Sequence, residues 1–539
     1  MPRKPPSNAP RTGIRGLLAA AACLPLALSA GSAHATGPYE AFFAIEGDLR
    51  DADGFGFVFD LDRQVSVADS IGGQSNQYSL RSFGGNGGTS ITGANYHFDG
   101  FDPRLALFED GANFAQNDDN IGLDPFLSWF SPALTDLYGA FPEHASSLAG
   151  NTRYDVNLTY AKGALSPAPG RETRFALDFV IPGDSGVEVS SFTSDPPFGV
   201  GLRGQVDRLT IGTNGPAVFG PDAPPTYVHT IESIVDIDTD VTVGATGVGQ
   251  LTIDDADLSL TSLHIGATVN GVVTGVGRVI LDSGQSVFVF EEFVVASGSE
   301  LVFREGAYSG TNTDVYGRLL GTSLSTSITA GFNIRDGGVV DPGRSNDTTA
   351  PVAGPGSLFM SFISFDSGST LEIDVFGGGP GGTDADFFAA DAVIIDPGAT
   401  LALTPVNPAL IERYDSQVVV GTLGLLNTVF DRVTGMTISS TESLAVTYDG
   451  TAVFVTAALN ADGNLDRSVD LLDFDILANN FGQSGTWVDG DWNGDGVVNL
   501  LDFDLVANNF GSSSPSQVPE PASLGLLALG GVMALRRRR

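Results

Sequence analysis

Oxygen-bearing side chains alternate along a short segment near the C-terminus of the chain. Counted as a twelve-residue loop that begins at Asp491, the segment has Gly496 at position 6, where a sharp turn belongs. The oxygens at positions 1, 3, 5, 7, 9 and 12 would come from Asp491, Asn493, Asp495, the backbone carbonyl of Val497, Asn499 and Asp502. Calcium takes six to eight hard oxygen ligands, and this spacing wraps them around one point. The segment therefore predicts a Ca2+ site.

An earlier segment repeats this pattern. Its residues at positions 1, 3, 5, 7, 9 and 12 are Asp462, Asn464, Asp466, Ser468, Asp470 and Asp473. The earlier copy departs from the pattern at Leu465 and Arg467. Arg467 replaces the turn glycine, where φ is usually positive and a side chain costs energy. Because the acidic ligands are all present, we expect this first site to bind calcium, but more weakly than the second.

Each loop runs directly into a predicted short helix, which begins near Asp470 in the first copy and near Asn499 in the second. The duplicated segments are residues 469–482 and 498–511, and Gly482 and Gly511 stand where a helix C-terminal cap belongs. Position 12 places an aspartate near each helix start, where the helix dipole favours a negative charge. The sequence predicts no matching helix before either loop.

The unit of a loop followed by a helix, present twice in residues 459–511, resembles a type I dockerin more than a complete EF-hand pair. The resemblance implies an EF-hand-like, Ca2+-binding module that docks on a cohesin, a β-sandwich partner protein. In dockerins, the residues at loop positions 10 and 11 help to determine which cohesin is bound, and cellulosomal dockerins commonly have a pair of hydroxyl residues there. The residues at these positions here are Leu471, Leu472, Leu500 and Leu501. The alternatives are another envelope protein as partner, or packing of these leucines against each other or against the β region.

Residues 36–230 alternate apolar and polar side chains between frequent turn residues, for example at 55–59, 154–160 and 175–179. This alternation predicts antiparallel, half-buried strands. An apolar strand at 101–108, a turn at Gly111 and a second strand from Phe114 complete a pattern that resembles the β-sandwich of bacterial pre-peptidase C-terminal domains. The resemblance covers residues 40–160, and we predict a β-sandwich-like region over 36–230.

Residues 231–458 have a different texture, in which strand-sized apolar groups recur beside small-residue turns. Examples are residues 249–253, 258–265, 277–281, 299–303, 367–375, 391–395 and 398–403. Repeated short strands with small corners predict a parallel β-solenoid, in which each rung buries its face on the next. The stretch resembles the passenger regions of autotransporter-like adhesins. A β-sandwich for part of it is the alternative.

Both ends of the chain have the features of export signals. Residues 1–35 combine a basic start, an apolar run and a terminal Ala33-His34-Ala35, which predicts a cleaved secretory signal peptide that contains the single cysteine, Cys23. Residues 512–539 contain a Pro-Glu-Pro at 519–521, an apolar run and four terminal arginines. This tail resembles the PEP-CTERM sorting signal, which implies transient membrane association through a short hydrophobic helix and processing by an exosortase-type protease.

The composition excludes some functions. A net charge of −38 argues against nucleic acid, whose phosphates need a basic surface. No H-E-x-x-H, G-x-S-x-G or P-loop motif occurs, and no G-x-G-x-x-G segment opens a predicted helix as a dinucleotide fingerprint does, so we expect no catalytic residues and no enzyme activity. The fold class predicted is mainly β: a sandwich, a solenoid, a small α module and a sorting helix.

Two hypotheses follow from these observations. The first is an exported, non-catalytic protein of the cell surface, outer envelope or extracellular matrix, with Ca2+-dependent docking through the module and extracellular polysaccharide as a further partner. The alternative is a secreted polysaccharide lyase or glycoside hydrolase that carries a dockerin. A cleft that contains a carboxylate with a raised pKa and a nearby Lys or Arg would favour the enzyme.

Overall fold

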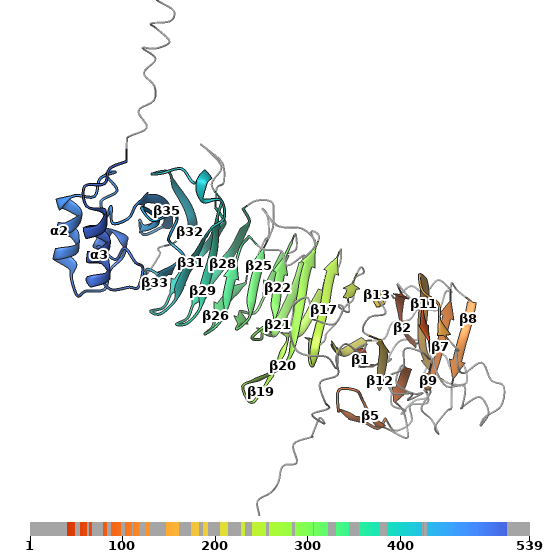
Figure 1. The fold of residues 1–539 in the computed structure, drawn as a ribbon. Helices are drawn as coiled ribbons and strands as arrows, with labels where there is room; N and C mark the ends of the chain where they lie inside the picture. Colours follow the sequence, from red (N-terminus) through yellow and green to blue (C-terminus); the bar gives the residue numbers. More distant parts are fainter. Residues whose placement is uncertain are drawn as a thin grey trace, which may run out of the picture. The chain divides into compact units, whose positions relative to one another are not determined.

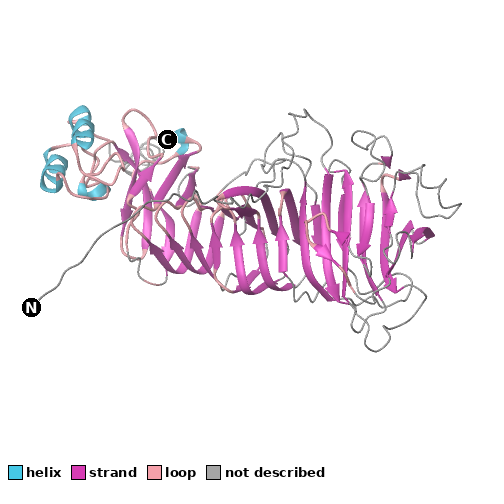
Figure 2. Cartoon of the chain, turned by 90° about the horizontal axis from the view of Figure 1, so that it is seen from below, coloured by secondary structure: helices cyan, strands magenta, loops and turns pink. Residues whose placement is uncertain are grey.

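The computed structural model describes residues between 40 and 514, and strands make up most of them (Figure 2). The prediction of a mainly β chain is therefore confirmed. The predicted signal peptide, and the sorting tail from residue 515 onward, lie outside the described residues. The described residues are 40–48, 54–61, 64–66, 79–83, 88–98, 103–109, 112–117, 126–128, 147–160, 174–182, 187–191, 205–213, 228–231, 240–254, 258–282, 286–304, 307–321, 330–343, 355–376, 385–422, 424 and 428–514.

The N-terminal strands pair antiparallel in two sheets. One sheet contains β1 (Glu40–Asp48), β4 (Ser79–Phe83), β9 (Phe126–Ser128), β12 (Arg174–Pro182) and β14 (Gln205–Thr213). The other contains β2 (Gly54–Leu61), β7 (Pro103–Glu109), β8 (Ala112–Asn117), β11 (Thr152–Tyr160) and β13 (Val187–Ser191). Four short strands form two small ribbons: β3 (Val65–Ser66) with β10 (Ser147–Leu148), and β5 (Gly88–Thr89) with β6 (Asn95–Tyr96).

Phenylalanines hold these two sheets together. Successive side chains of a strand point to opposite faces, so alternate phenylalanines of β2 share one face. Phe43 of β1 meets Phe57 of β2 with ring centroids 4.8 Å apart, and Phe179 of β12 lies 4.8 Å from Phe59. All four rings are buried. The alternation seen in the sequence therefore builds an aromatic core between the two sheets.

From β14 onward the ladders become parallel, and successive strands mostly join the two sheets in turn (Figure 1). One sheet continues with β16 (Asp240–Val243), β18 (Leu258–Ile265), β21 (Ser286–Val295), β24 (Thr313–Val315), β26 (Gly331–Ile334), β28 (Ser357–Phe365) and β30 (Phe387–Ile395). The other continues with β15 (Val228–Ile231), β17 (Gly247–Asp254), β20 (Val272–Asp282), β22 (Glu300–Phe303), β25 (Arg318–Gly321), β27 (Val339–Asp341), β29 (Thr370–Val375), β31 (Thr400–Pro405) and β33 (Arg432–Thr434). Two short strands, β19 (Ala267–Val269) and β23 (Ala307–Gly310), pair beside β20 and β21. All of the strand-like segments predicted in this part of the sequence overlap one of these strands.

Matching apolar residues stack from one strand to the next in this parallel part. Leu371 of β29 pairs in register with Leu401 of β31, and Ile373 pairs with Leu403. These side chains are buried, whereas the intervening residues of β29 are only partly buried. Several corners between the sheets are four-residue turns whose third residue is a glycine with positive φ, as at Gly298, Gly368 and Gly398. The recurring small-residue turns in the sequence are these corners.

The last strands are antiparallel. β32 (Ser416–Thr422), which follows the short turn η4 (Pro408–Leu410), pairs with β35 (Ala452–Leu459), and β35 pairs with β34 (Glu442–Tyr448). β33 ends the other sheet. The predicted limits of the two β regions at residues 230 and 458 stay predictions, because both ladders continue from the antiparallel into the parallel part.

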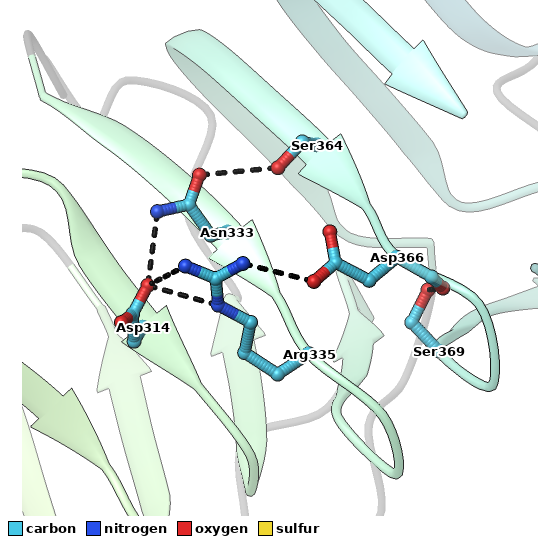
Figure 3. A network of polar contacts seen from close by, with 6 residues as sticks. All are labelled: Asp314, Asn333, Arg335, Ser364, Asp366 and Ser369. Carbon is cyan, nitrogen blue, oxygen red and sulfur yellow. Dashed lines mark hydrogen bonds and ion pairs between the residues drawn. The ribbon is translucent and has the colours of Figure 1, made fainter. Parts of the chain in front are cut away.

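A polar network links three neighbouring strands on the outer face of the parallel part (Figure 3). Arg335 donates from Nη2 to Oδ1 of Asp314 at 2.7 Å and from Nη1 to Oδ2 of Asp366 at 2.9 Å. Asn333 donates to the same Asp314 oxygen at 2.9 Å and accepts from Ser364 at 3.1 Å. The three charged side chains remain about one-third exposed, so solvent screens the network.

Replacing Arg335 by alanine is expected to lower the free energy of unfolding by no more than about 1 kcal/mol, because partly exposed ion pairs contribute little. The loss should shrink at high salt, which screens the same charges in the wild type. Denaturant unfolding of both proteins at about 0.05 M and about 1 M salt measures the loss of stability and its dependence on salt. A loss of several kcal/mol that salt does not change would contradict this assignment.

Candidate metal centre

Each loop is followed by a helix that begins within the last four residues of the loop. α2 (Leu471–Asn480) has Asp470 as its N-cap, and α3 (Leu500–Asn509) has Asn499. In α3 the Asn499 side chain accepts from the Leu501 N–H at 2.8 Å, while Oδ2 of Asp502 accepts from the Asn499 N–H at 2.9 Å. α2 has the same capping box. Capping boxes of this kind satisfy the open N–H groups of a helix start. Positions 9 and 12 of each loop are therefore fixed by the helix that follows.

The carboxylates at the two ends of the second loop are buried and face its backbone. Asp491 accepts from the N–H groups of Gly494 and Gly496 at 3.0 and 2.9 Å. Oδ1 of Asp502 accepts from the N–H groups of Trp492 and Asn493 at 2.8 and 3.0 Å. These bonds wrap the loop around its two terminal carboxylates.

The remaining polar groups of the second loop converge on one amide. The Nδ2 atom of Asn499 lies 3.0 Å from Oδ2 of Asp495 and 2.8 Å from the backbone oxygen of Val497. Asn493 also donates to Asp495, at 3.0 Å. The side-chain nitrogen of Asn499 thus lies among the oxygens of positions 5 and 7. The same amide group also carries an oxygen, which is the atom that a cation would need from position 9. The structure links Asn493, Asp495, Val497 and Asn499 by hydrogen bonds, while Asp491 and Asp502 bond to the loop backbone.

The first loop has a similar set of hydrogen bonds, with two differences. Asp462 accepts from the N–H of position 5, whereas Asp491 accepts from that of position 4, and Asp470 lacks the amide with which Asn499 donates. Asp462 accepts from the N–H groups of Asp466 and Arg467, and Asp473 accepts from those of Gly463 and Asn464. Asp466 accepts from Ser468 N–H at 3.0 Å, as Asp495 does from Val497 in the second loop. The predicted ligands of the first copy therefore occupy the positions that their counterparts occupy in the second.

The backbone conformation explains the departures at Leu465 and Arg467. Their φ angles are 57° and 79°, and the equivalent residues Gly494 and Gly496 have 72° and 88°. Both loops thus adopt the left-handed conformation at positions 4 and 6, which costs a non-glycine residue about 1–2 kcal/mol. The guanidinium of Arg467 lies 5.0 Å from the ring centroid of Tyr414, a cation–π contact that offsets part of this cost.

The glycines of the second loop also allow close contact with the β region. A Cβ atom at Gly494 would lie 2.3 Å from the backbone oxygen of Val433, and one at Gly496 would lie 2.3 Å from that of Asp431. The Val433 N–H donates to the Gly494 oxygen at 2.9 Å, next to the buried Trp492. The first loop contacts the β region through the Tyr414 hydroxyl, which donates to Asp462 at 2.6 Å. Both loops are therefore built onto the end of the β region, which the sequence did not indicate.

Burial raises the pKa of the terminal carboxylates. The pKa of Asp491 is raised to about 6, chiefly by burial, and the negative charges of Asp502 and Asp495 add to the shift. Burial likewise raises the pKa of Asp462, Asp473 and Asp502. In each loop, burial and the neighbouring carboxylates therefore disfavour the ionised form of these side chains. A bound cation would counteract this effect.

The donor set suits calcium. The described residues contain no cluster of three or more His, Cys, Asp or Glu side chains arranged as ligands of one ion. This holds for the three aspartates of the second loop and the four of the first as well. By residue type alone, carboxylates together with amide, hydroxyl and backbone oxygens match calcium rather than zinc. The residues that would hold the ion are those predicted from the sequence.

In calcium-free buffer, replacing Asp491 by asparagine is expected to flatten the dependence of stability on pH. A carboxyl whose folded pKa is raised to about 6 contributes stability that is fully present below the unfolded value of 3.8 and is lost as the pH rises through about 6. Asparagine does not titrate, so the stability of the variant lacks this pH-dependent contribution. Thermal unfolding of wild type and variant across this pH range measures the difference, and parallel pH profiles would contradict it.

An apolar surface lies beside the loops and is formed by both helices. We call it the leucine–phenylalanine face; its members are Leu471, Leu472, Phe474, Leu500, Leu501 and Phe503. The four leucines are 67%, 57%, 68% and 59% exposed, so they pack neither against each other in a buried cluster nor against the β region. Phe474 and Phe503 meet edge to face with centroids 6.4 Å apart and join the two halves of the face. The sequence interpretation missed these phenylalanines, although each follows the first leucine of its pair by three residues, one helical turn.

The comparisons with known proteins bear on the C-terminus. The model for the PEP-CTERM protein-sorting motif matches residues 517–539, within the predicted tail. A search of curated proteins found no match. Among the described helices, none has the length and apolar character to span a bilayer. The sorting motif identifies the chain as an exported protein that is sorted to the cell surface and processed by an exosortase.

Proposed function

We propose that this protein is a non-catalytic component of the cell surface or extracellular matrix whose residues 459–511 form a dockerin-like module. In this proposal the module binds two calcium ions and docks a partner protein, cohesin-like or another envelope protein, through the leucine–phenylalanine face. The β body, a sandwich over residues 36–230 similar to pre-peptidase C-terminal domains and a solenoid over 231–458, carries the module. The alternation of parallel strands between two sheets supports the solenoid.

The duplicated unit of loop and helix is the observation that carries the proposal. Two segments of different sequence at positions 4 and 6 adopt the same left-handed backbone there, although one of them must place Leu465 and Arg467 in it. Both end in a buried position-12 aspartate that also caps a helix. A shared, partly strained loop around desolvated carboxylates is what a common cation ligand would maintain.

The position of the unusual carboxyls supports a non-catalytic role. In the described β region, burial raises the pKa of Asp178 to about 6 and that of Asp386 to about 7. Asp178 accepts from Ser90 Oγ and the Ile91 N–H at 2.6 and 2.7 Å. Asp386 accepts from the N–H groups of Gly356 and Asp374 at 2.8 and 2.9 Å and is fully buried. Both carboxyls are buried and are engaged in holding the backbone through these hydrogen bonds.

A pull-down with the mature chain tests docking. The whole chain is used because the module shares contacts with the β region. The immobilised chain would be exposed to envelope proteins of the source organism, first in calcium and then in EGTA. The variant Asp473→Ala/Asp502→Ala removes both position-12 carboxylates. Its control is Asp391→Ala/Asp396→Ala, two exposed aspartates of the β region, outside the module and the leucine–phenylalanine face.

A partner that wild type and control retain only in calcium, and that the position-12 variant does not retain, is the expected result. Equal retention by all three proteins in EGTA would exclude calcium-dependent docking. A depolymerase screen on acidic and neutral glycans tests the enzyme alternative, since the surface protein is expected to release no product.

A further inference from the structure

One corner of the parallel region differs from the others. After β18 the chain does not turn directly into the next strand but forms a hairpin in which β19 pairs antiparallel with the start of β20 (Figure 1). Asn270 and Gly271 at its tip have φ angles of 53° and 78°, as a two-residue hairpin turn with the twist of a strand pair requires. In repeated folds, insertions of this kind commonly lie on the binding face.

The hairpin forms one wall of a groove with a volume of about 520 Å³. Ala267 and Thr268 line it from the hairpin. His264 of β18 and Glu292 of β21 line it from the sheet, and Tyr316, just after β24, lines it from a later corner. The volume is that of a small-molecule or oligomer subsite. The floor strands β16, β18 and β21 are each hydrogen-bonded on both sides, so they offer no edge to which a peptide strand could add.

The lining combines an exposed ring with paired hydrogen-bonding groups. Nε2 of His264 lies 3.3 Å from Oε2 of Glu292, and both side chains reach solvent. Tyr316 is 42% exposed. The site therefore offers an acceptor, a nitrogen, hydroxyls and one exposed aromatic ring.

Charge narrows the class of ligand. None of the described residues that line the groove is a lysine or arginine, and the chain has a net charge of −38. Polyanions are therefore disfavoured. A neutral saccharide matches the lining, because its hydroxyls both donate and accept hydrogen bonds while the C–H face of its ring packs on an aromatic side chain.

We propose that this groove binds a neutral saccharide chain, with Tyr316 as the stacking platform and His264 and Glu292 as hydrogen-bonding partners of its hydroxyls. The site belongs to the β body and does not depend on the calcium module. It gives the surface protein a second kind of contact, to glycan as well as to protein.

Affinity electrophoresis of the mature protein through gels that contain laminarin, dextran or galactomannan tests the proposal, with alginate as the polyanionic probe. Wild type should be retarded by at least one neutral polymer and not by alginate. Tyr316→Ala and Thr268→Trp, which fills the groove, should each weaken that retardation at least about tenfold, the effect of losing about 1.4 kcal/mol. Phe359→Ala, which removes an exposed ring of β28, is the matched control and should migrate as wild type does.

Three results would overturn the proposal: no retardation of wild type by any neutral polymer, equal retardation of wild type and both groove variants, or retardation by alginate alone. Asp502→Ala separates this proposal from the calcium-dependent function, because it should retain saccharide binding. Loss of saccharide binding in Asp502→Ala would place the glycan on the module and also overturn the proposal. Unfolding temperatures of all variants verify that each is folded.

Discussion

Replacing Asp502 by alanine is expected to lower the free energy of unfolding by about 4–6 kcal/mol when calcium is in excess. At a calcium concentration one-hundredfold above the dissociation constant, one bound ion contributes about 2.7 kcal/mol, and the variant loses this contribution. It also leaves the N–H groups of Trp492, Asn493 and Asn499 without their acceptor, and an unsatisfied buried donor costs about 1–3 kcal/mol. Denaturant unfolding with calcium and with EGTA separates the two contributions.

Asp504→Ala is the matched control for this experiment, because Asp504 is the same residue type on the same helix and is exposed. It should change stability by less than about 0.5 kcal/mol in either buffer. If Asp502→Ala lost the same stability with calcium as with EGTA, position 12 would serve only as a helix cap. This result would contradict calcium binding by the second loop.

A variant of the leucine–phenylalanine face in which Leu471, Leu472, Leu500 and Leu501 are all aspartate is expected to lose more than about one-hundredfold in affinity for the docked partner. A one-hundredfold loss corresponds to about 2.8 kcal/mol in total, and placing four carboxylates in an apolar interface without partners would cost more than that. Because the four side chains are mostly exposed, their replacement should leave folding almost unchanged, and the added carboxylates, at loop positions 10 and 11, should favour rather than weaken cation binding. Retention of the partner in calcium, followed by titration of the purified partner, measures the loss.

Leu410→Asp provides the control for the leucine–phenylalanine face. Leu410 is also an exposed leucine, but it lies in η4, outside the module. It should leave retention unchanged. Undiminished retention by the fourfold aspartate variant would contradict docking through the two helices and would direct attention to another surface of the chain.

The parts of this structure that the sequence predicted are those encoded over short distances. Apolar alternation such as that of Phe55, Phe57 and Phe59 marks a strand wherever it occurs, and the predicted strands overlap observed ones. The loop residues were predictable for the same reason. Twelve consecutive residues contain both the candidate ligands and the turn of the calcium-loop pattern.

Other features depend on contacts between distant residues, which leave no local pattern. The Val433 N–H meets Gly494, and Tyr414 meets Asp462, across 61 and 48 residues of sequence respectively. Arg467 could be recognised as a departure from the glycine pattern, but its contact with Tyr414 could not be predicted. The groove was equally hidden, because His264, Glu292 and Tyr316 come from separate strands and corners.

The contact between the second loop and β33 bears on self-association. β33 is the last strand of its sheet among those described, and its Val433 N–H is taken up by the Gly494 carbonyl. A terminal strand with open N–H and C=O groups is a template on which another chain can add a strand. The module therefore covers part of the edge of β33. Proteolytic removal of the residues after 459 is expected to open this edge to pairing with a strand of another chain.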